Sequence, residues 1–417
     1  MNPENSLLIS PDSRTGRVGV PAGSTQDPVL VRAPRDEMDR RWALVRAHLT
    51  AQGLDAVICL GSDDSLSGSI RWLCDFGAPA YMKVALFFGE TPMTVIEHGA
   101  ISGIREVSPA DANTPGVGRV RAVSAFKSVR QTLEYEARAV VEEFSARGIE
   151  NVGLVRPGSM PSAFIDRLKQ DLPQVSWSDE TAAFDSMMAI KSPVELDSLR
   201  EACRVQDQAF ERLLGQVRPG VREVELMASV ERELRLRGAL DGTLGCGSAP
   251  AGQPTGMRSW RAQNRELQKG DTFTVLIELS NAGGYYAELA RQVVLGRASH
   301  EQRRAFEVVR EAQAETAASL YAGASCSALA GAHDAFMEAR GYERETRLLG
   351  HGQGYDMVEA PLLRADETMA LRADMFVSVH PSVVTPSMFV FLCDNYVVQP
   401  AGPAVRLHDT PQELFEV

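Results

Sequence analysis

The chain has no apolar run of the length that a membrane-spanning helix requires, which is about 18 or more residues. Its first residues also lack a basic segment followed by an apolar one, so we expect no signal peptide. Together these two absences predict a cytoplasmic protein with no membrane partner.

Runs of basic residues and closely spaced cysteine pairs are missing as well. The 43 Lys and Arg are outnumbered by 55 Asp and Glu, giving a net charge of -12, which argues against a nucleic-acid partner. The six cysteines are scattered without a CxxC pair, a pattern typical of reduced thiols in an intracellular protein. A length of 417 residues with 44% hydrophobic content predicts two or three globular domains.

Three regions differ in their patterns. Residues 1–35 are rich in Pro, Gly, Ser and Asp without periodicity, which predicts a tail or an arm that packs on a partner subunit. Residues 36–185 alternate helical and strand patterns, which predicts a compact α/β domain. Its helices are expected from Asp36 to Gly53 and over 128–147, and its strands over 55–60, 83–88, 93–96 and 151–155.

The remaining region, 186–417, opens with a helix-start signal. Ser192 can cap the helix, Pro193 suits its first turn, and Glu195 stands where a capping box needs a carboxylate. We expect this helix to end near Leu214. Further helices are predicted over 223–238, 300–322 and 327–340, and strands over 272–280, 284–295, 374–380 and 387–398.

Two glutamates flank a predicted hairpin turn at residues 281–283. Glu278 and Glu288 are ten residues apart, so in a simple hairpin they face each other on one side of the sheet. Two facing carboxylates repel, and burying them requires a cation or a shared proton. The ordinary alternative is a pair of solvent-facing glutamates.

Three more ligand-capable residues follow. His351 lies in the glycine-rich stretch Gly350–Gly354, where the backbone can approach a ligand closely. His380 ends an alternating strand just before a proline, and Cys393 lies on the next predicted strand. A single histidine of this kind is more often structural than a ligand, so the interpretation depends on the set.

Taken in order, these stretches resemble the pita-bread family of methionine aminopeptidase, Xaa-Pro aminopeptidase, prolidase and creatinase. The matching motifs are Leu267–Asp271 with Glu278, Gly284–Arg291, Gly350–Gly354 with Glu359–Pro361, Asp374–Pro381, and Cys393-Asp394. The resemblance implies an α+β fold: a curved antiparallel sheet covered by helices, preceded by a smaller creatinase-like α/β domain. It also implies a homodimer.

The departures from the family pattern shape the functional hypothesis. The peptidases bind two metals through Asp, Asp, His, Glu and Glu, and the matching residues here are Glu278, Glu288, His351, His380 and Cys393. All five can still bind a metal. The resemblance implies one divalent ion (Mn, Fe or Zn) held by Glu288, His351 and His380, with Glu278, Cys393 and the neighbouring Asp394 as further candidates. Cys393 is alternatively a supporting thiol, a nucleophile or an inert buried cysteine.

Two further histidines of the family are absent, since the corresponding positions are Val358 and approximately Ser259. We therefore expect a non-peptidase hydrolase that cleaves a C–N bond of a small molecule with metal-activated water. Glu278, His351 and His380 are the candidate catalytic residues, with Glu278 moving the proton. Arg258, Trp260, Tyr286 and Glu359 are the candidate substrate-binding residues.

Several alternatives stay open. A metal-free, creatinase-like hydrolase would use His351 or His380 as general acid or base. Creatinase keeps a glutamate at the position of His380 and another that matches Ala290, so the likeness to creatinase itself is distant. A metal-dependent lyase, an oxygen-using enzyme and a pseudoenzyme that only binds its ligand are the other possibilities.

Overall fold

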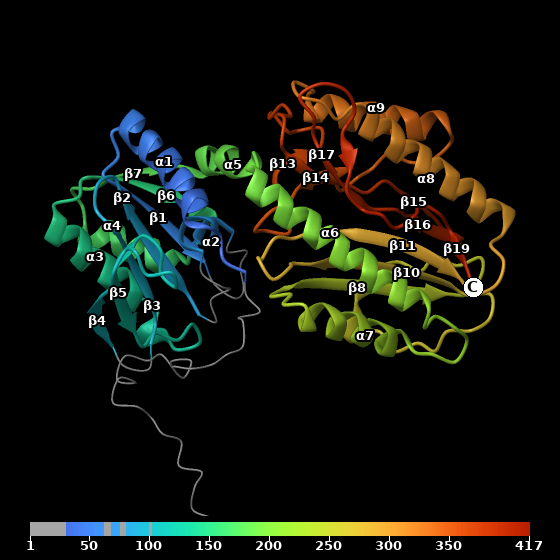
Figure 1. Ribbon diagram of the computed structural model, residues 1–417, viewed down its shortest axis with the longest axis horizontal. Helices are drawn as coiled ribbons and strands as arrows, with labels where there is room; N and C mark the ends of the chain where they lie inside the picture. The colour runs from blue at the N-terminus through green and yellow to red at the C-terminus, as the bar shows by residue number, and fades with distance from the viewer. Residues whose placement is uncertain (1–30, 62–67, 76–80, 100–101) are drawn as a thin grey trace, which may run out of the picture. The chain divides into compact units, whose positions relative to one another are not determined.

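The computed structural model describes residues 31–61, 68–75, 81–99 and 102–417, so the predicted arm lies outside the described residues up to residue 30. The contacts divide the chain into two units. The first covers the described part of Arg32–Phe184, and the second covers Asp185–Val417 together with Val31. Each unit has its own sheets and helices (Figure 1).

The first unit is built on a seven-stranded mixed sheet in the order β4-β5-β3-β2-β1-β6-β7. The strands are β1 Ala56–Gly61, β2 Lys83–Phe88, β3 Met93–His98, β4 Gly103–Glu106, β5 Val117–Val123, β6 Asn151–Val155 and β7 Ser176–Asp179. The helices are α1 Arg35–Gln52, α2 Gly68–Cys74, α3 Tyr135–Arg147, α4 Ser162–Asp171 and α5 Thr181–Ala189, the last of which continues into the second unit. Apolar residues of β1, β2, α3 and α4 form its core.

Local signals explain where two of these helices begin and end. Helix α1 ends as predicted at Gly53, which has a left-handed φ of 66° and closes the helix with its N–H. Helix α3 is shorter than the predicted 128–147, because residues 130–132 form a 3-10 turn. The Thr132 hydroxyl accepts the Phe126 N–H at 2.9 Å and so competes with helix formation.

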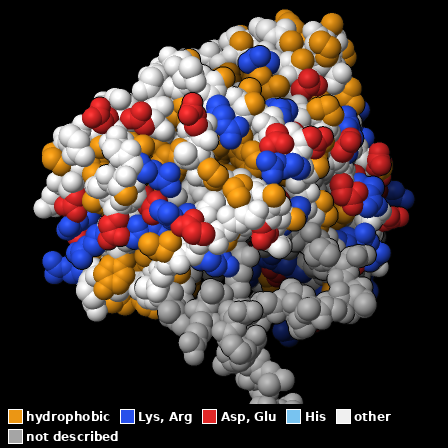
Figure 2. Space-filling view, turned by 60° about the vertical axis from the view of Figure 1, so that its left-hand side comes forward, with side chains coloured by type: hydrophobic (Ala, Val, Ile, Leu, Met, Phe, Trp, Pro, Cys, Tyr) orange, Lys and Arg blue, Asp and Glu red, His pale blue; other side chains and the backbone are white. Residues whose placement is uncertain are grey.

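The charged side chains of the molecule are intermixed rather than segregated on the face shown in Figure 2. Basic and acidic groups alternate there, with apolar side chains between them. Arg–Glu pairs such as Arg119 with Glu106 at 2.7 Å contribute to the surface of the first unit. The acidic excess of the sequence is therefore not gathered into one patch on that face.

The second unit contains two five-stranded sheets, ordered β19-β11-β10-β8-β9 and β13-β12-β14-β17-β18, and the hairpin β15-β16. The strands of the first sheet are β8 Gly242–Ala249, β9 Arg258–Ser259, β10 Thr272–Leu279, β11 Leu289–Val294 and β19 Phe415–Glu416. Those of the second are β12 Gly350–Gly352, β13 Glu359–Leu363, β14 Phe376–Val379, β17 Asp394–Val397 and β18 Val405–Arg406. The hairpin pairs β15 Ser382–Thr385 with β16 Met388–Phe391.

Two pairs of helices cover these sheets (Figure 1). Helices α6 Pro193–Leu214 and α7 Glu223–Leu236 share a core with β8, β10 and β11. Helices α8 His300–Ala318 and α9 Cys326–Ala339 pack on each other and on the second sheet and the hairpin. The predicted capping box of α6 is confirmed, because Ser192 Oγ accepts the Glu195 N–H at 3.2 Å and Glu195 returns the contact at 2.9 Å.

A backbone bridge joins the two sheets of the second unit. Ala290, on β11, exchanges both backbone hydrogen bonds with Cys393, just before β17, at 3.2 and 3.3 Å. This bridge places the start of β11 against the second sheet. Residues from both sheets can therefore converge at that point, which is where the candidate metal centre lies.

Candidate metal centre

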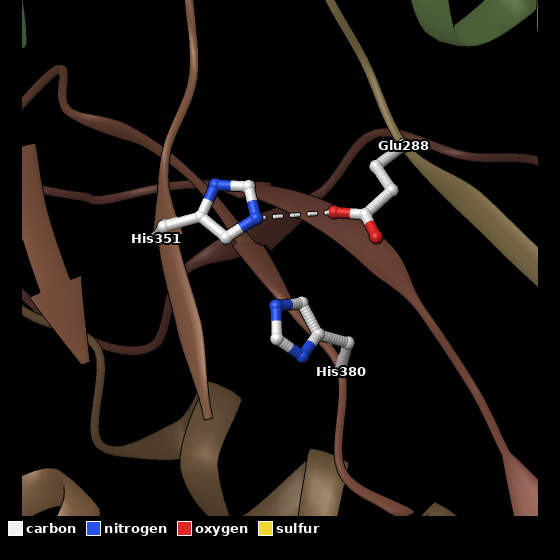
Figure 3. A group of neighbouring side chains, drawn as sticks. All are labelled: Glu288, His351 and His380. Carbon is white, nitrogen blue, oxygen red and sulfur yellow. Dashed lines mark ion pairs between the residues drawn. The ribbon is translucent and has the colours of Figure 1, made fainter. Parts of the chain in front are cut away.

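Three buried side chains converge at the junction of the two sheets. Glu288 directly precedes β11, His351 lies on β12, and His380 directly follows β14. One ligand atom from each lies within 4.8 Å of the others. Figure 3 shows the His351 ring and the Glu288 carboxylate facing each other, with the His380 ring beside them. Three segments that are distant in the sequence thus supply one carboxylate and two imidazoles.

Tight packing of β12 sets the position of His351. The strand pairs with β13 on one side and β14 on the other, and His351 lies opposite Ser378. A Cβ atom on Gly350 would lie 2.2 Å from the Ser378 carbonyl oxygen, and one on Gly352 would lie 2.3 Å from that of Ala360. Both glycines of the Gly-His-Gly sequence are therefore required by the close approach of the neighbouring strands.

The hydrogen bonds of His351 favour a ligand role for its Nε2 atom. Nδ1 lies 3.0 Å from the Gly352 carbonyl oxygen, which can only accept. With its proton on Nδ1, the neutral ring presents an Nε2 lone pair, 3.4 Å from Glu288 Oε2 and 3.2 Å from Ser378 Oγ. This is the arrangement by which a backbone carbonyl orients a metal-binding histidine.

Two buried polar atoms of the group lack ordinary partners. Within the described residues, neither Glu288 Oε2 nor His380 Nε2 has a hydrogen-bond partner. Such orphaned atoms are rare in folded proteins because burying them unpaired is costly. A divalent cation would satisfy both atoms, so the residues present fit a metal ion.

The electrostatics of the group also suit a cation. Burial alone would raise the pKa of Glu288, but the neighbouring His351 and His380 rings lower it to about 2. Burial lowers the pKa of His380 to about 4, with Glu288 acting in the opposite direction. At neutral pH the Glu288 carboxylate is therefore ionised and the His380 imidazole is neutral, the states in which each binds a metal.

Glu278 lies next to this group without joining it. The β10–β11 register pairs Ile277 with Leu289, and Ser280 bridges to Tyr286, so Glu278 and Glu288 are opposite each other as predicted. Glu278 is not part of the three-residue group, and its Oε1 instead accepts a hydrogen bond from Gln353 Nε2 at 3.0 Å. Burial and the Glu288 charge raise the pKa of Glu278 well above its usual value. A carboxyl group that holds its proton more tightly than usual is suited to proton transfer.

Cys393 and Asp394 are also outside the group, contrary to the predicted ligand set. The Cys393 thiol lies 3.7 Å from the Glu288 carbonyl oxygen, and burial raises its pKa well above the usual value, so it stays protonated. Asp394 forms a fully buried ion pair with Arg291 at 2.7 Å. The structure supports the inert reading of Cys393 and gives Asp394 a structural role.

The four predicted substrate-binding residues are dispersed. Tyr286 is buried, and its N–H donates to the Gly354 carbonyl at 2.7 Å, so it adjoins the loop after His351. Glu359 is bonded to Lys191 Nζ at 2.6 Å and is therefore already paired. Arg258 is exposed on β9, and Trp260 packs on the core between α7 and β8. Of the four, Tyr286 and Glu359 contact the segment that follows His351, since Glu359 Oε1 also accepts the Asp356 N–H at 3.1 Å.

Other residues near the site had no motif of their own in the sequence analysis. Gln353 and Asn395 are fully buried and hydrogen-bonded to each other at 2.7 Å. The sequence signal for them is their spacing, because each lies two residues after a candidate ligand, His351 or Cys393. The exposed Arg347 is close enough to lower the pKa values of Glu278 and His380, although in each case burial acts more strongly. Val358, at the position of the second family histidine, is 44% exposed.

Comparison with known proteins agrees with this geometry. The model of metallopeptidase family M24 matches residues 197–410, just over half of the chain, and this stretch includes the three residues of the group. The protein is a member of family M24. Membership implies the use of a divalent metal, which the three-residue group fits.

Individual relatives and solved structures of other proteins also match this chain. A Xaa-Pro dipeptidase from Pyrococcus horikoshii is 26% identical over 283 residues, covering 66% of this chain and 78% of that protein. An X-Pro aminopeptidase structure from Thermotoga maritima matches with a TM-score of 0.75 at 18% identity, covering 90% of this chain and 99% of that chain. A Xaa-Pro dipeptidase structure from Bacillus anthracis has a TM-score of 0.74 at 21% identity, with coverage of 91% and 100%. The expected α+β pita-bread fold with a preceding smaller domain is thereby confirmed.

The same comparisons correct the functional prediction. The Pyrococcus relatives are both named Xaa-Pro dipeptidase, and a matching mycobacterial protein is named a probable dipeptidase. The expected non-peptidase hydrolase of a small molecule is therefore wrong as a main interpretation. The residues that differ from the family pattern still form a compact group that fits a cation. Among the described residues, every helix is too short or too polar to cross a membrane.

Proposed function

We propose that this protein is a metal-dependent peptidase that cleaves short peptides with proline in the second position. The observation that carries the proposal is the convergence of Glu288, His351 and His380 in a buried group with two orphaned atoms. The Xaa-Pro specificity is supported by the names of the relatives. These three residues would hold one Mn, Fe or Zn ion, each of which accepts carboxylate and imidazole ligands.

The bound ion would polarise the scissile carbonyl and lower the pKa of a water molecule. Glu278 would carry the proton, because burial and the charge of Glu288 raise the pKa of its carboxyl group. Two carboxyl groups whose pKa values are driven apart are a recurring arrangement for acid–base work. Gln353 would keep the Glu278 carboxyl in place through its 3.0 Å hydrogen bond. In this scheme Glu278 protonates the leaving imino nitrogen.

The exposed Arg347 bears on the length of the substrate that we propose. Its guanidinium acts on the pKa values of both Glu278 and His380, which places a positive charge at the edge of the group. A guanidinium there suits the terminal carboxylate of a dipeptide, which it can bind in a bidentate manner. We therefore favour dipeptides over longer peptides as substrates.

A second candidate is a protein of the same fold that binds such peptides without cleaving them. The observation that favours it is Val358, which stands where the family resemblance expects a second histidine. A valine cannot transfer a proton or donate a hydrogen bond to a peptide. The two candidates share the metal group and differ in turnover.

The test is to strip the purified chain of metal, reload it with Mn, Fe or Zn, and assay Xaa-Pro and Xaa-Ala dipeptides. We expect one ion per chain by elemental analysis and cleavage of the Xaa-Pro bond. His351→Ala and His380→Ala should each lose the ion and the activity, whereas His333→Ala, which alters a buried histidine in α9, should keep both.

The possible results separate the candidates. Peptide binding with one ion per chain but no cleavage would favour the non-cleaving protein. Unchanged metal content and activity in both ligand variants would overturn the assignment of the centre. Full activity of the metal-free chain would favour the creatinase-like alternative.

A further inference from the structure

A line of buried polar side chains leads from Glu278 away from the metal centre. Gln353 Nε2 donates to Glu278 Oε1 at 3.0 Å, and Asn395 Nδ2 donates to Gln353 Oε1 at 2.7 Å. Both amide side chains are fully buried. Because no solvent reaches them, the orientation of each amide group depends only on its hydrogen-bond partners within the protein.

The orientation of Asn395 is set by its oxygen. Asn395 Oδ1 accepts the Glu288 N–H at 2.7 Å and lies 3.1 Å from His408 Nε2. An amide oxygen accepts and an amide nitrogen donates, so Nδ2 must point to the other side, toward Gln353. Gln353 then turns its own oxygen to Asn395 and its N–H groups to Glu278. The backbone N–H of Glu288 and the far-end residue His408 therefore fix the direction of the line together.

That far end is an ion pair between His408 and Asp207. His408 Nδ1 lies 3.1 Å from Asp207 Oδ1, and Asp207 also accepts the Thr410 hydroxyl at 2.6 Å and the Asp409 N–H at 2.8 Å. Burial would lower the pKa of His408, but Cys203 and Asp207 raise it to about 10. At neutral pH the imidazolium thus donates from both nitrogens, one proton to Asp207 and one to Asn395.

We propose that Asp207 and His408 are remote positioning residues for Glu278. By donating to Asn395, His408 holds the two amides so that the N–H of Gln353 points at the Glu278 carboxyl group. Asp207 keeps the ring of His408 in place and charged. The effect on catalysis rests on the proposed function, since it requires Glu278 to transfer a proton; the orientation of the amides does not.

The opposite orientation shows why the far end matters. A neutral His408 with an unprotonated Nε2 would no longer donate to the Asn395 oxygen and would leave the Glu288 N–H to hold it alone. If the Asn395 amide turned over, its oxygen would face Gln353, which would turn its nitrogen inward and its oxygen toward Glu278. An oxygen at that point accepts only from a protonated carboxyl and repels an ionised one. Glu278 must pass through both states to transfer a proton, so the observed direction favours turnover.

Asn395 and Gln353 separate the pair from Glu278. Asp207 is on α6, and together with Arg204, Asp409 and Thr410 it lines a surface pocket of about 370 Å³. Among the described residues, Asp207 forms its hydrogen bonds with His408, Asp409 and Thr410 rather than with Glu288, His351 or His380. Asn395 contacts both Gln353 and the Glu288 N–H, so a substitution at Asp207 is compared with and without Gln353 to separate these two routes.

A double-mutant cycle on Xaa-Pro dipeptide cleavage provides the kinetic test. Asp207→Asn removes the charge that holds His408, and Gln353→Met cuts the line next to Glu278. We expect Asp207→Asn to lower kcat about tenfold with KM within about twofold, and to have no further effect in the Gln353→Met background. His333→Gln, which alters a buried histidine of α9, should leave kcat unchanged. Additive losses in the cycle would overturn the proposal.

A second measurement is independent of peptidase activity. In protein labelled with ¹⁵N at Asn and Gln side chains, Gln353→Met identifies the Gln353 amide signals by their loss. We expect Asp207→Asn to shift those signals although Asp207 does not touch Gln353, and His333→Gln to leave them in place. If Asp207→Asn does not fold, His408→Gln carries the same test, because it keeps a donor and removes the charge.

The two measurements separate the two proposals. Gln353 signals that stay in place in whichever of these variants folds would overturn the positioning role. The wild-type chain could lack peptidase activity while the Gln353 signals still shift in the variant. That result would overturn the proposed function and support the positioning role. Both proposals are supported when the signals shift and the kinetic effects fail to add.

Discussion

The side chains at the centre of the site differ in whether they hold a proton at neutral pH. Burial and the Glu288 charge raise the pKa of Glu278, whereas hydrogen bonding and positive charge outweigh burial and lower that of Glu288 to about 2. Burial lowers the pKa of His380 to about 4. The carboxyl group to which we assign proton transfer and the groups to which we assign cation binding are thus distinguished by their surroundings, not by residue type.

Arg347 gives a prediction about substrate choice. Replacement by alanine removes the charge that we assign to the terminal carboxylate, so KM for Xaa-Pro dipeptides should rise about tenfold. The same dipeptides with an amidated C-terminus should show no change. Steady-state kinetics with both substrates checks this, with Arg344→Ala, an exposed arginine paired with Glu338 at 2.9 Å, as the matched control. Equal losses for both substrates would contradict the assignment.

The Asp207–His408 ion pair gives a prediction about pH and stability. Burial opposes the charge of His408, but Cys203 and Asp207 raise its pKa from 6.5 to about 10. A raised folded-state pKa contributes stability that is fully present below the unfolded value and is lost as pH rises through the folded value. The free energy of unfolding should therefore fall between about pH 6.5 and 10, by up to roughly 1.4 kcal/mol for each unit of pKa shift.

Denaturant titrations across that pH range, on wild type and His408→Gln, measure this contribution. The variant lacks the titrating group, so its stability curve should be flatter over the same range. Parallel curves for the two proteins would show that the ion pair does not contribute. The Asp207 carboxyl group does not titrate in this pH range. Burial raises its pKa, but the His408 partner outweighs burial and lowers the pKa to about 2.

At the scale of elements, the short strand β12 holds the site together through backbone contact. Its two glycines leave no room for a Cβ atom on either side of His351. Gly350→Ala would place a methyl group 2.2 Å from the Ser378 carbonyl oxygen, so β12 and β14 must separate. We expect a loss of about 1–3 kcal/mol in unfolding free energy and weaker metal binding.

The matched control is Gly331→Ala on the exposed face of α9. A Cβ atom there has open space around it, and alanine favours a helix interior, so stability should rise by up to about 1 kcal/mol. Chemical denaturation and metal titration of both variants make the comparison. A Gly350→Ala protein as stable as wild type would show that β12 can shift without cost.

Several elements followed from local signals and several did not. The end of α1 at Gly53 and the capping box of α6 were predictable because each depends on residues within one turn. The predicted strand over 387–398 is divided into β16 and β17, because Leu392 and Cys393 cross from the hairpin to the second sheet. Strand β8 was missed because its glycines hide the strand pattern, although it pairs with β10 along its whole length.

At the scale of the whole molecule, the metal group belongs to one unit. Glu288, His351 and His380 all lie within Asp185–Val417. A ligand that binds the folded state alone stabilises it by about 2.7 kcal/mol at a hundred times its Kd. Metal should therefore slow amide exchange in this unit, most of all in β12 and β14, and should change the first unit little.

Hydrogen-exchange mass spectrometry with and without metal checks this expectation. His380→Ala should abolish the added protection at matched metal concentration. Equal protection of both units, or protection that survives in the variant, would contradict a centre confined to the second unit. Homodimer formation, which the resemblance implied, stays a prediction, and the elution volume of the full chain tests it.

The sequence by itself determined the fold family and predicted the residues of the candidate cation group. The ordered motifs from Leu267 to Asp394 can be recognised in the sequence because each encodes a local turn, strand or glycine contact. Only the tertiary structure decided which of the five ligand-capable residues act together. Glu278 is hydrogen-bonded to Gln353, and the Cys393 thiol contacts the Glu288 carbonyl. Both contacts depend on how the two sheets meet at Ala290 and Cys393. Distances across that junction follow from packing between distant segments, which no local pattern records.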